Sequence, residues 1–144
     1  MRVVVQRVLK ASVLVEDEIV GNIDKGYLLY IGISVKDDEK TTIKMAEKIH
    51  NLRVFEDENG KMNLNLNQVR GSILSISQFT LYGDTKGNNR PSFIEAARPD
   101  QANPLYELLN KELEKHHHVE KGVFGAHMNI DSINDGPVTI VIEI

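Results

Sequence analysis

The sequence predicts an α+β fold in one domain over residues 1–144: a curled, barrel-like, mostly antiparallel sheet with two main helices packed against it. The chain has 144 residues, of which 41% are hydrophobic and 26% charged, the size and composition of one globular domain. Short β-branched and apolar runs recur along the chain, whereas only two segments show helical periodicity. No internal repeat or linker divides the chain. Many short strands with few helices therefore indicate a curled sheet covered by helices.

The amino-terminal part of the chain predicts strands. Valine-rich runs stand at 3–5 and 13–15, a short strand is expected over 19–23, and a longer apolar strand over 26–35. Such consecutive strands with short connections favour an antiparallel meander.

Two helices are expected between and after the strands. Asp37 or Asp38 is a suitable N-cap for the first, which has apolar residues at near-helical spacing and should end near Arg53. The second is clearer, because its leucines follow an i, i+3, i+4, i+8 pattern over 105–113, and Pro104 is expected near its first turn. Its leucine stripe is expected to pack in the core.

The remaining segments predict further strands and turns. Asn59-Gly60 is a turn signal between an apolar pair at 54–55 and an amphipathic edge strand around 64–66. An apolar strand is expected over 73–79, and the carboxyl end of the chain predicts a final strand after the second helix.

Composition excludes several function classes. The chain has no Cys, which removes disulfides, thiolate nucleophiles and Cys-based zinc sites. No apolar run approaches the roughly 20 residues needed to span a bilayer, and the first residues do not resemble a signal peptide, so we expect a cytoplasmic protein without a membrane partner. The formal net charge of −4 argues against a protein that coats nucleic acid. Local basic residues are candidates for small positive patches: Arg2, Arg7, Lys10, Lys86, Arg90 and Arg98.

Three consecutive histidines, His116 to His118, follow the second helix. Consecutive side chains point in different directions and do not converge on one ion, and no His-Glu-x-x-His spacing is present. We therefore expect these residues to decorate the helix C-terminus, where positive charge suits the helix dipole. His50 and His127 are expected to be surface or packed residues, so the sequence predicts no metal site.

The stretch Ser77-Gln78-Phe79-Thr80 ends the apolar strand and attracts chemical interest. A hydroxyl becomes a nucleophile only with a base within hydrogen-bond reach, and none lies nearby in sequence. Backbone N–H groups at a strand end can instead stabilise an oxyanion. A Ser and a Thr at a strand edge are also often purely structural, so the residue types alone leave all three roles open.

A second stretch of interest is Asn134-Asp135-Gly136-Pro137-Val138-Thr139. Its simplest interpretation is a hairpin corner between strands over 128–133 and 138–144. An X-Pro bond can also be cis at little intrinsic cost. A cis bond can direct two adjacent carbonyls the same way, which suits a ligand ammonium group.

Together these two stretches resemble the motifs Ser-Gln-x-Thr and Asn-x-Gly-Pro-x-Thr of the D-aminoacyl-tRNA deacylase family, bacterial and eukaryotic type. The similarity continues through blocks at residues 1–8, 51–57, 60–64, 90–93 and 122–128. Either motif alone is weak evidence, but both in order, with the intervening blocks, are specific. The departures are small: the Lys86-Gly87 pair stands one position further from Arg90 than is usual in the family, and the histidine run is not a family feature.

The resemblance implies a homodimer that needs no metal or other cofactor. The implied reaction is hydrolysis of the ester joining a D-amino acid, or glycine, to the 3′-terminal adenosine of tRNA, with rejection of L-aminoacyl-tRNA. In this interpretation the amides of Phe79 and Thr80 face the ester carbonyl, Ser77 and Gln78 shape the pocket, and the Phe79 ring lies against adenine. The Gly136-Pro137 peptide is expected to be cis and to select chirality in the partner subunit's site. The residues expected to support the pocket are Arg7, Ala126, Met128, Asn134 and Thr139.

The chemical role of Thr80 has two interpretations. It is the obvious side-chain nucleophile, but because no base is evident we favour a positional role, with water activated by the 2′-hydroxyl of the substrate. Two other function classes stay open. A non-catalytic nucleic-acid-binding module would not need both motifs at one pocket, and a small-molecule esterase or D-peptidase would not depend on the adenosine.

Overall fold

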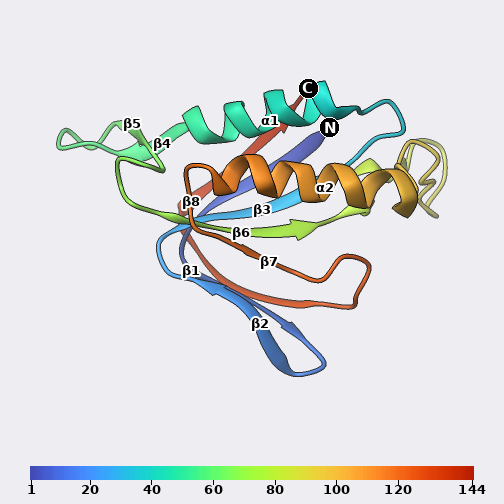
Figure 1. The fold of residues 1–144 in the computed structure, drawn as a ribbon, viewed down its shortest axis with the longest axis horizontal. Helices are drawn as coiled ribbons and strands as arrows, with labels where there is room; N and C mark the ends of the chain where they lie inside the picture. Colours follow the sequence, from blue (N-terminus) through green and yellow to red (C-terminus); the bar gives the residue numbers. More distant parts are fainter.

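A computed structural model describes all 144 residues and shows a curled sheet with two helices across one face (Figure 1). The main sheet has six strands in the order β2-β1-β3-β6-β7, and β8 also pairs with β1. The strands are β1 (Arg2–Val15), β2 (Glu18–Ile23), β3 (Gly26–Gly32), β6 (Ser72–Ser77), β7 (Val119–Lys121) and β8 (Asn129–Glu143). β1 is antiparallel to β2, β3 and β8, whereas β3 and β6, and β6 and β7, are parallel. The α+β fold with a mostly antiparallel, curled sheet is therefore confirmed.

The two valine runs near the amino terminus belong to one long strand, β1. Its first half pairs with β3 and its second half with β2, while β8 follows it along the other edge. Irregular register between Gln6, Val8 and Lys10 bends the strand, since bulges increase local twist. The bend moves the strand's buried side chains from one core to another: Val3 and Val5 belong to the larger core cluster, and Val8 and Val13 to the smaller one.

The hairpin corner expected at Asn134 to Pro137 is wrong, because β8 continues through this stretch. β8 pairs with β1 on both sides of it, with Thr139 opposite Gln6 and Asn134 opposite Val8. Four residues of β8 therefore stand opposite the single residue Arg7. Pro137 has no N–H to give to the ladder, so the backbone bulges outward without ending the strand. We call residues 135–138 the β8 bulge.

The helices are α1 (Glu39–Asn51) and α2 (Pro99–Glu114). Asp38 caps α1 by accepting a hydrogen bond from the Thr41 amide at 2.8 Å. α2 begins with Pro99 in its first turn, so Pro104 lies inside the helix. The expectation that Pro104 stands near the first turn is therefore wrong. The predicted leucine stripe does face the core: Leu105, Leu109 and Leu113 are buried.

A large apolar core of 22 buried residues lies between the helices and the sheet, and a second cluster of seven lies within the curl of β1, β2, β3 and β6. A small separate hairpin, β4 (Arg53–Glu56) and β5 (Met62–Asn65), turns at Gly60, which has a positive φ of 72°. Neither helix has the length and apolar character needed to cross a bilayer.

Candidate active site

β6 ends at Ser77, two residues earlier than the expected strand over 73–79, and a 3₁₀ helix, η1 (Phe79–Tyr82), follows. The last backbone hydrogen bond from this segment to β3 runs from the main-chain N–H of Gln78 to the Ile31 carbonyl at 2.7 Å. The first N–H groups of a helix have no partner inside it. The amides of Phe79 and Thr80 therefore stand where β6 stops pairing, as donors that a ligand can use.

η1 is held closely against the sheet. A Cβ added to Gly32 of β3 would lie 2.9 Å from the Leu81 Cβ, so only glycine permits this approach. From β1, Arg2 donates to the Leu81 carbonyl at 2.5 Å and lies over the Tyr82 ring. These contacts fix the backbone that presents the amides of Phe79 and Thr80.

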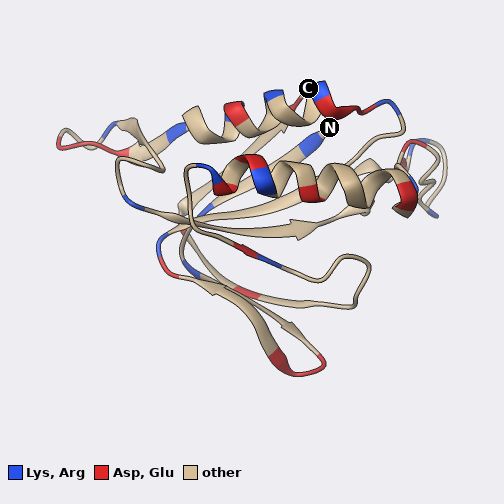
Figure 2. Ribbon diagram, viewed as in Figure 1, with Lys and Arg blue, Asp and Glu red and all other residues tan.

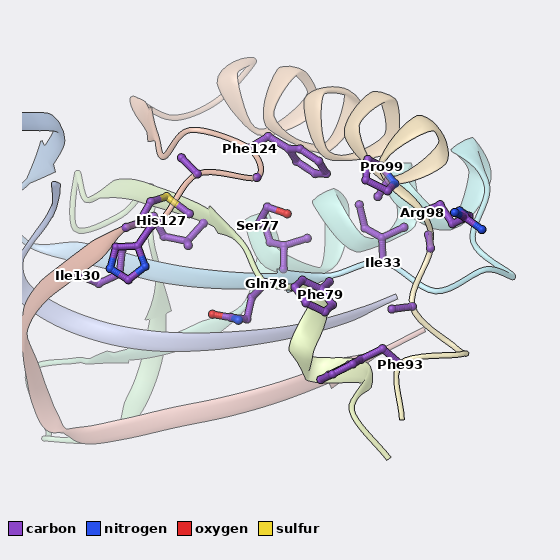
Figure 3. Close-up of a pocket in the computed structure, with 18 residues that line it drawn as sticks. Ile33, Ser77, Gln78, Phe79, Phe93, Arg98, Pro99, Phe124, His127 and Ile130 are labelled. Atoms are coloured by element: carbon purple, nitrogen blue, oxygen red, sulfur yellow. The ribbon is translucent and has the colours of Figure 1, made fainter. Parts of the chain in front are cut away.

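A pocket of about 530 Å³ opens beside the end of β6 (Figure 3). Twelve of its 18 lining residues are hydrophobic, with few polar groups among them, as is typical of ligand sites. Figure 3 shows Ser77 and Phe79 in the middle of the wall, with His127 toward one end and Arg98 toward the other. The lining residues are Ile31, Ile33, Ile76 to Phe79, Phe93, Ala96 to Pro99, Ala102, Phe124 to Met128 and Ile130.

An exposed aromatic pair stands at the pocket. The Phe79 ring is 55% exposed and meets Phe93 edge to face, with ring centroids 5.0 Å apart. Aromatic rings left open at a cavity offer stacking surface to a flat ligand. Sequence reasoning had not included Phe93 as a site residue, although it ends the block at 90–93; only the fold brings it beside Phe79.

The Thr80 side chain makes no hydrogen bond to a basic group. Its hydroxyl accepts a hydrogen bond from Nε2 of the Gln78 side chain. A carboxamide nitrogen of this kind cannot take up a proton and so cannot act as a base. Thr80 is exposed, and its side chain does not line the pocket, in contrast to Ser77, Gln78 and Phe79. The residue follows Phe79 directly in η1, so its backbone N–H, and not its side chain, is the group next to the pocket-lining stretch.

Arg7 is buried, 5% exposed, directly behind the β8 bulge. Its Nε donates to the main-chain oxygen of Asp135 at 3.1 Å, and its Nη1 donates to the carbonyl of Val54 at 2.7 Å. The carboxylates of Asp135 and Glu56 lie within 3.4 and 4.0 Å of the guanidinium. Buried guanidinium groups need such partners, and here they connect β1 to the bulge and to β4.

The side chain of Asn134 forms hydrogen bonds across the β8 bulge. Asn134 donates to the Thr139 hydroxyl at 3.1 Å and accepts from the Val138 amide at 3.2 Å. The Gly136-Pro137 peptide is cis, as the resemblance implied, and both residues are exposed.

The residues expected at one site thus form two groups in this chain. Ser77, Gln78, Phe79, Ala126 and Met128 line the pocket. The second group, which does not line it, consists of Gly136, Pro137, Arg7, Asn134 and Thr139.

The histidines are arranged differently from the sequence expectation. His117 is buried, 8% exposed, and its Nε2 lies 2.9 Å from Nδ1 of His50 on α1, so it does not simply decorate the end of α2. His116 stacks on His50 with ring centroids 4.3 Å apart. The approach of the two helix ends, which the local pattern does not reveal, brings these rings together. No group of three or more metal-ligating side chains is present in the structure.

Comparison with known proteins places this geometry in a family. A family model described as D-Tyr-tRNA(Tyr) deacylase matches residues 4–143. Proteins named D-aminoacyl-tRNA deacylase are 57% identical in Bacillus pumilus, over 97% of this chain and 96% of that protein, and 56% identical in Brevibacillus brevis, over 99% of each.

Two solved structures have the same fold. One, the c-Myc DNA Unwinding Element Binding Protein, is 40% identical and superposes with a TM-score of 0.94 over 100% of this chain and 99% of the other. The other, a probable eukaryotic D-amino acid tRNA deacylase, shares 18% identity and shows the fold, with a TM-score of 0.85 over 99% and 98% of the two chains. On the evidence of the family model and the relatives, the chain belongs to the D-Tyr-tRNA(Tyr) deacylase family.

Proposed function

We propose that the protein hydrolyses the ester between a D-amino acid, or glycine, and the 3′-terminal adenosine of tRNA, and that it spares L-aminoacyl-tRNA. The observation that carries this proposal is the pair of amides at Phe79 and Thr80 beside an apolar pocket, in a chain of this family. A volume of about 530 Å³ suits a nucleoside-sized ligand. The reaction is a chirality proofreading step, and we place it in the cytoplasm, where aminoacyl-tRNA is used.

The pocket suits the terminal adenosine. Its walls are largely apolar, and the exposed rings of Phe79 and Phe93 offer a surface against which adenine can stack. Ser77 and Gln78 supply polar groups next to Phe79 in sequence, and Ala126 and Met128 add to the lining of the pocket.

The chemical step needs little from side chains. The ester is already activated, so holding its carbonyl oxygen at the amides of Phe79 and Thr80 stabilises the charge that develops there. Water, assisted by the substrate's own 2′-hydroxyl, adds to the carbonyl carbon. The bond from this carbon to the 3′-oxygen then breaks, and the 3′-oxygen takes a proton, which releases the amino acid and the tRNA. In this step the Thr80 hydroxyl, which accepts a hydrogen bond from the Gln78 side chain, takes no proton and forms no bond to the substrate.

A second copy of the chain completes the site. Gly136 and Pro137 are exposed and lie outside the pocket of their own chain. β8 pairs only with β1, so its other edge is open, and Ile133 and Val141 on this strand are 45% and 58% exposed. In a two-fold dimer each chain gives and receives the same element. Each bulge then enters the pocket of the other chain.

Selection of the enantiomer follows from this arrangement by exclusion. Carbonyl groups of the bulge hold the α-ammonium of the substrate while the amides of Phe79 and Thr80 hold the ester carbonyl. The Cβ of an L-residue is then directed into the bulge, which Arg7 supports from behind and which cannot retreat without strain. Glycine has no Cβ, so this geometry does not reject it.

Two other functions are less well supported. A relative's name refers to a DNA element, but this chain has a net charge of −4, and Figure 2 shows acidic and basic positions interspersed along the ribbon. A general esterase would use the same pocket without the adenosine.

The experiment compares D-Tyr-tRNA with the ethyl ester of D-tyrosine and with a D-tyrosyl peptide. We expect efficient hydrolysis of the D-Tyr-tRNA alone. Equal kcat/KM for the ethyl ester would favour a small-molecule esterase and contradict the proposal.

A further inference from the structure

Arg98 is the only Lys or Arg among the residues that line the pocket, and no Asp or Glu lines it. It lies at the end of the pocket opposite His127 (Figure 3). The residue is exposed, and none of the ion pairs of the structure includes it. The pocket therefore has one permanent charge on its wall, which is positive and unpaired.

The backbone that carries Arg98 is held on both sides. The backbone N–H of the preceding residue, Ala97, donates a hydrogen bond at 2.8 Å to the carbonyl of Ile33, which directly follows β3. The carbonyl of Arg98 accepts from the amides of Gln101 and Ala102 at 3.0 and 2.8 Å. The side chain thus starts from a fixed point while its guanidinium is free to bind a ligand.

The chemistry of the proposed substrate leaves one partner for this guanidinium. Adenine and ribose are neutral, and the α-ammonium of the amino acid is positive. The only anion close to the terminal adenosine is the phosphate that joins it to the preceding nucleotide, and planar guanidinium groups bind phosphate oxygens well. Lys86 and Arg90, in the loop before Phe93, do not line the pocket.

We infer that Arg98 binds the phosphate on the 5′ side of the terminal adenosine, and that this contact makes the site prefer tRNA to a free aminoacyl-adenosine. The inference rests on the proposed function. Arg98 acts on binding and takes no part in breaking the ester.

The test uses two substrates that share the same ester: D-Tyr-tRNA, and 3′-O-D-tyrosyl-adenosine, which has no phosphate. For Arg98→Ala and Arg98→Gln we expect kcat/KM on the tRNA to fall about 10-fold or more, mainly through a higher KM. Neither variant should change kcat/KM on the nucleoside. Arg98→Lys should recover part of the loss on the tRNA, since it restores charge without the planar group.

Salt dependence gives a second readout. For the tRNA, the slope of log kcat/KM against log salt concentration should become less steep by about 0.7 in Arg98→Ala, the value for one phosphate contact on a single strand. Lys111→Ala is the matched control, because Lys111 is exposed on α2, the helix that begins directly after Arg98, has no ion pair and lies outside the pocket. It should leave both substrates unchanged.

The outcomes separate cleanly. Unchanged tRNA kinetics in Arg98→Ala, or equal losses on the two substrates, would overturn the phosphate contact while leaving the proposed function standing. A wild-type protein that cleaves neither substrate would overturn the proposed function, and the phosphate contact with it.

Discussion

The Nε of Arg7 on β1 donates a hydrogen bond to the main-chain oxygen of Asp135 on β8 at 3.1 Å, across the two longest strands of the sheet. Because the same guanidinium donates to the Val54 carbonyl at 2.7 Å, one buried cation connects β1, β4 and the β8 bulge. It lies immediately behind Gly136, where its Nη2 would be 3.2 Å from an added Cβ. A bulge supported in this way is suited to act as a rigid element in a neighbouring chain's site.

Arg7→Gln is expected to weaken both the fold and the activity. It removes buried hydrogen bonds from a charged group, which costs about 2–3 kcal/mol of unfolding free energy, and it leaves the bulge free to move. Urea denaturation and deacylation of D-Tyr-tRNA measure the two effects. Lys10→Ala, at an exposed position on the same strand, should change neither. Wild-type stability and activity in Arg7→Gln would show that the bulge does not depend on this side chain.

Gly136→Ala should cost more than another glycine substitution at positive φ. Gly136 has φ of 130°, and an added Cβ would lie 2.9 Å from Val138 Cγ2. Gly60→Ala is the control, because Gly60 has φ of 72° but nothing within 4 Å of an added Cβ. Backbone strain of about 1–3 kcal/mol applies to both variants, whereas crowding and loss of deacylation should appear in Gly136→Ala alone. Equal stability losses with full activity in both would contradict the crowding.

Thr80→Ala should reduce deacylation by less than about 100-fold, because the backbone amide at position 80 remains and only a positioning group is lost. A substrate without the 2′-hydroxyl should be the poorer one for the wild-type protein. Single-turnover deacylation with ribo and 2′-deoxy substrates measures both effects. Complete loss in Thr80→Ala together with full wild-type activity on the 2′-deoxy substrate would establish Thr80 as the nucleophile.

The protein should be a dimer at micromolar concentration, and Val141→Lys should make it a monomer with little activity. Val141 is 58% exposed in the isolated chain, so a lysine there should hardly alter the fold of the monomer. Ile43→Lys, at a 39% exposed position on α1, is the matched control and should remain dimeric. Light scattering alongside the deacylation assay tests this. A fully active wild-type monomer would exclude a site completed by a second copy.

Acidification should destabilise the protein through His50 and His117. Burial, followed by the neighbouring histidines, lowers the pKa of His117 from 6.5 to about 4, and burial followed by His116 lowers that of His50. Between pH 6.5 and about 4 the histidines of the unfolded chain bind more protons than those of the folded protein. The free energy of unfolding therefore falls as the pH drops through this range. The slope is at most about 1.4 kcal/mol per pH unit for each proton.

Urea denaturation between pH 7.5 and 4.5 measures this effect, with His50→Gln/His117→Gln as the reference. The double variant should show a flatter pH dependence than the wild type. Identical pH profiles would mean that the two rings titrate normally in the folded protein.

The features of the fold that depend on residues close in sequence were predicted, and those that depend on distant residues were not. The helices, the Asp38 cap and the Gly60 turn depend on neighbours in sequence, and the structure confirms them. The continuity of β8 depends on its pairing with β1, which lies at the opposite end of the sequence, so a strong local turn signal suggested a hairpin corner instead. The burial of His117 has a similar origin, in the approach of two helix ends.

The candidate site shows the same division. The motif at 77–80 identified the end of β6, although not the 3₁₀ helix that Gly32 makes room for. Phe93 and Arg98 reach the pocket from a loop and a helix start, and no local pattern marks them as its lining.

The most direct test of the central claim is deacylation of D-Tyr-tRNA, L-Tyr-tRNA and Gly-tRNA by the wild-type protein under identical conditions. A rigid bulge that excludes an L-side chain predicts rapid hydrolysis of the D-Tyr and Gly substrates, with the L-Tyr substrate left at its spontaneous rate. Appreciable enzymatic cleavage of L-Tyr-tRNA, or no cleavage of D-Tyr-tRNA, would contradict the account.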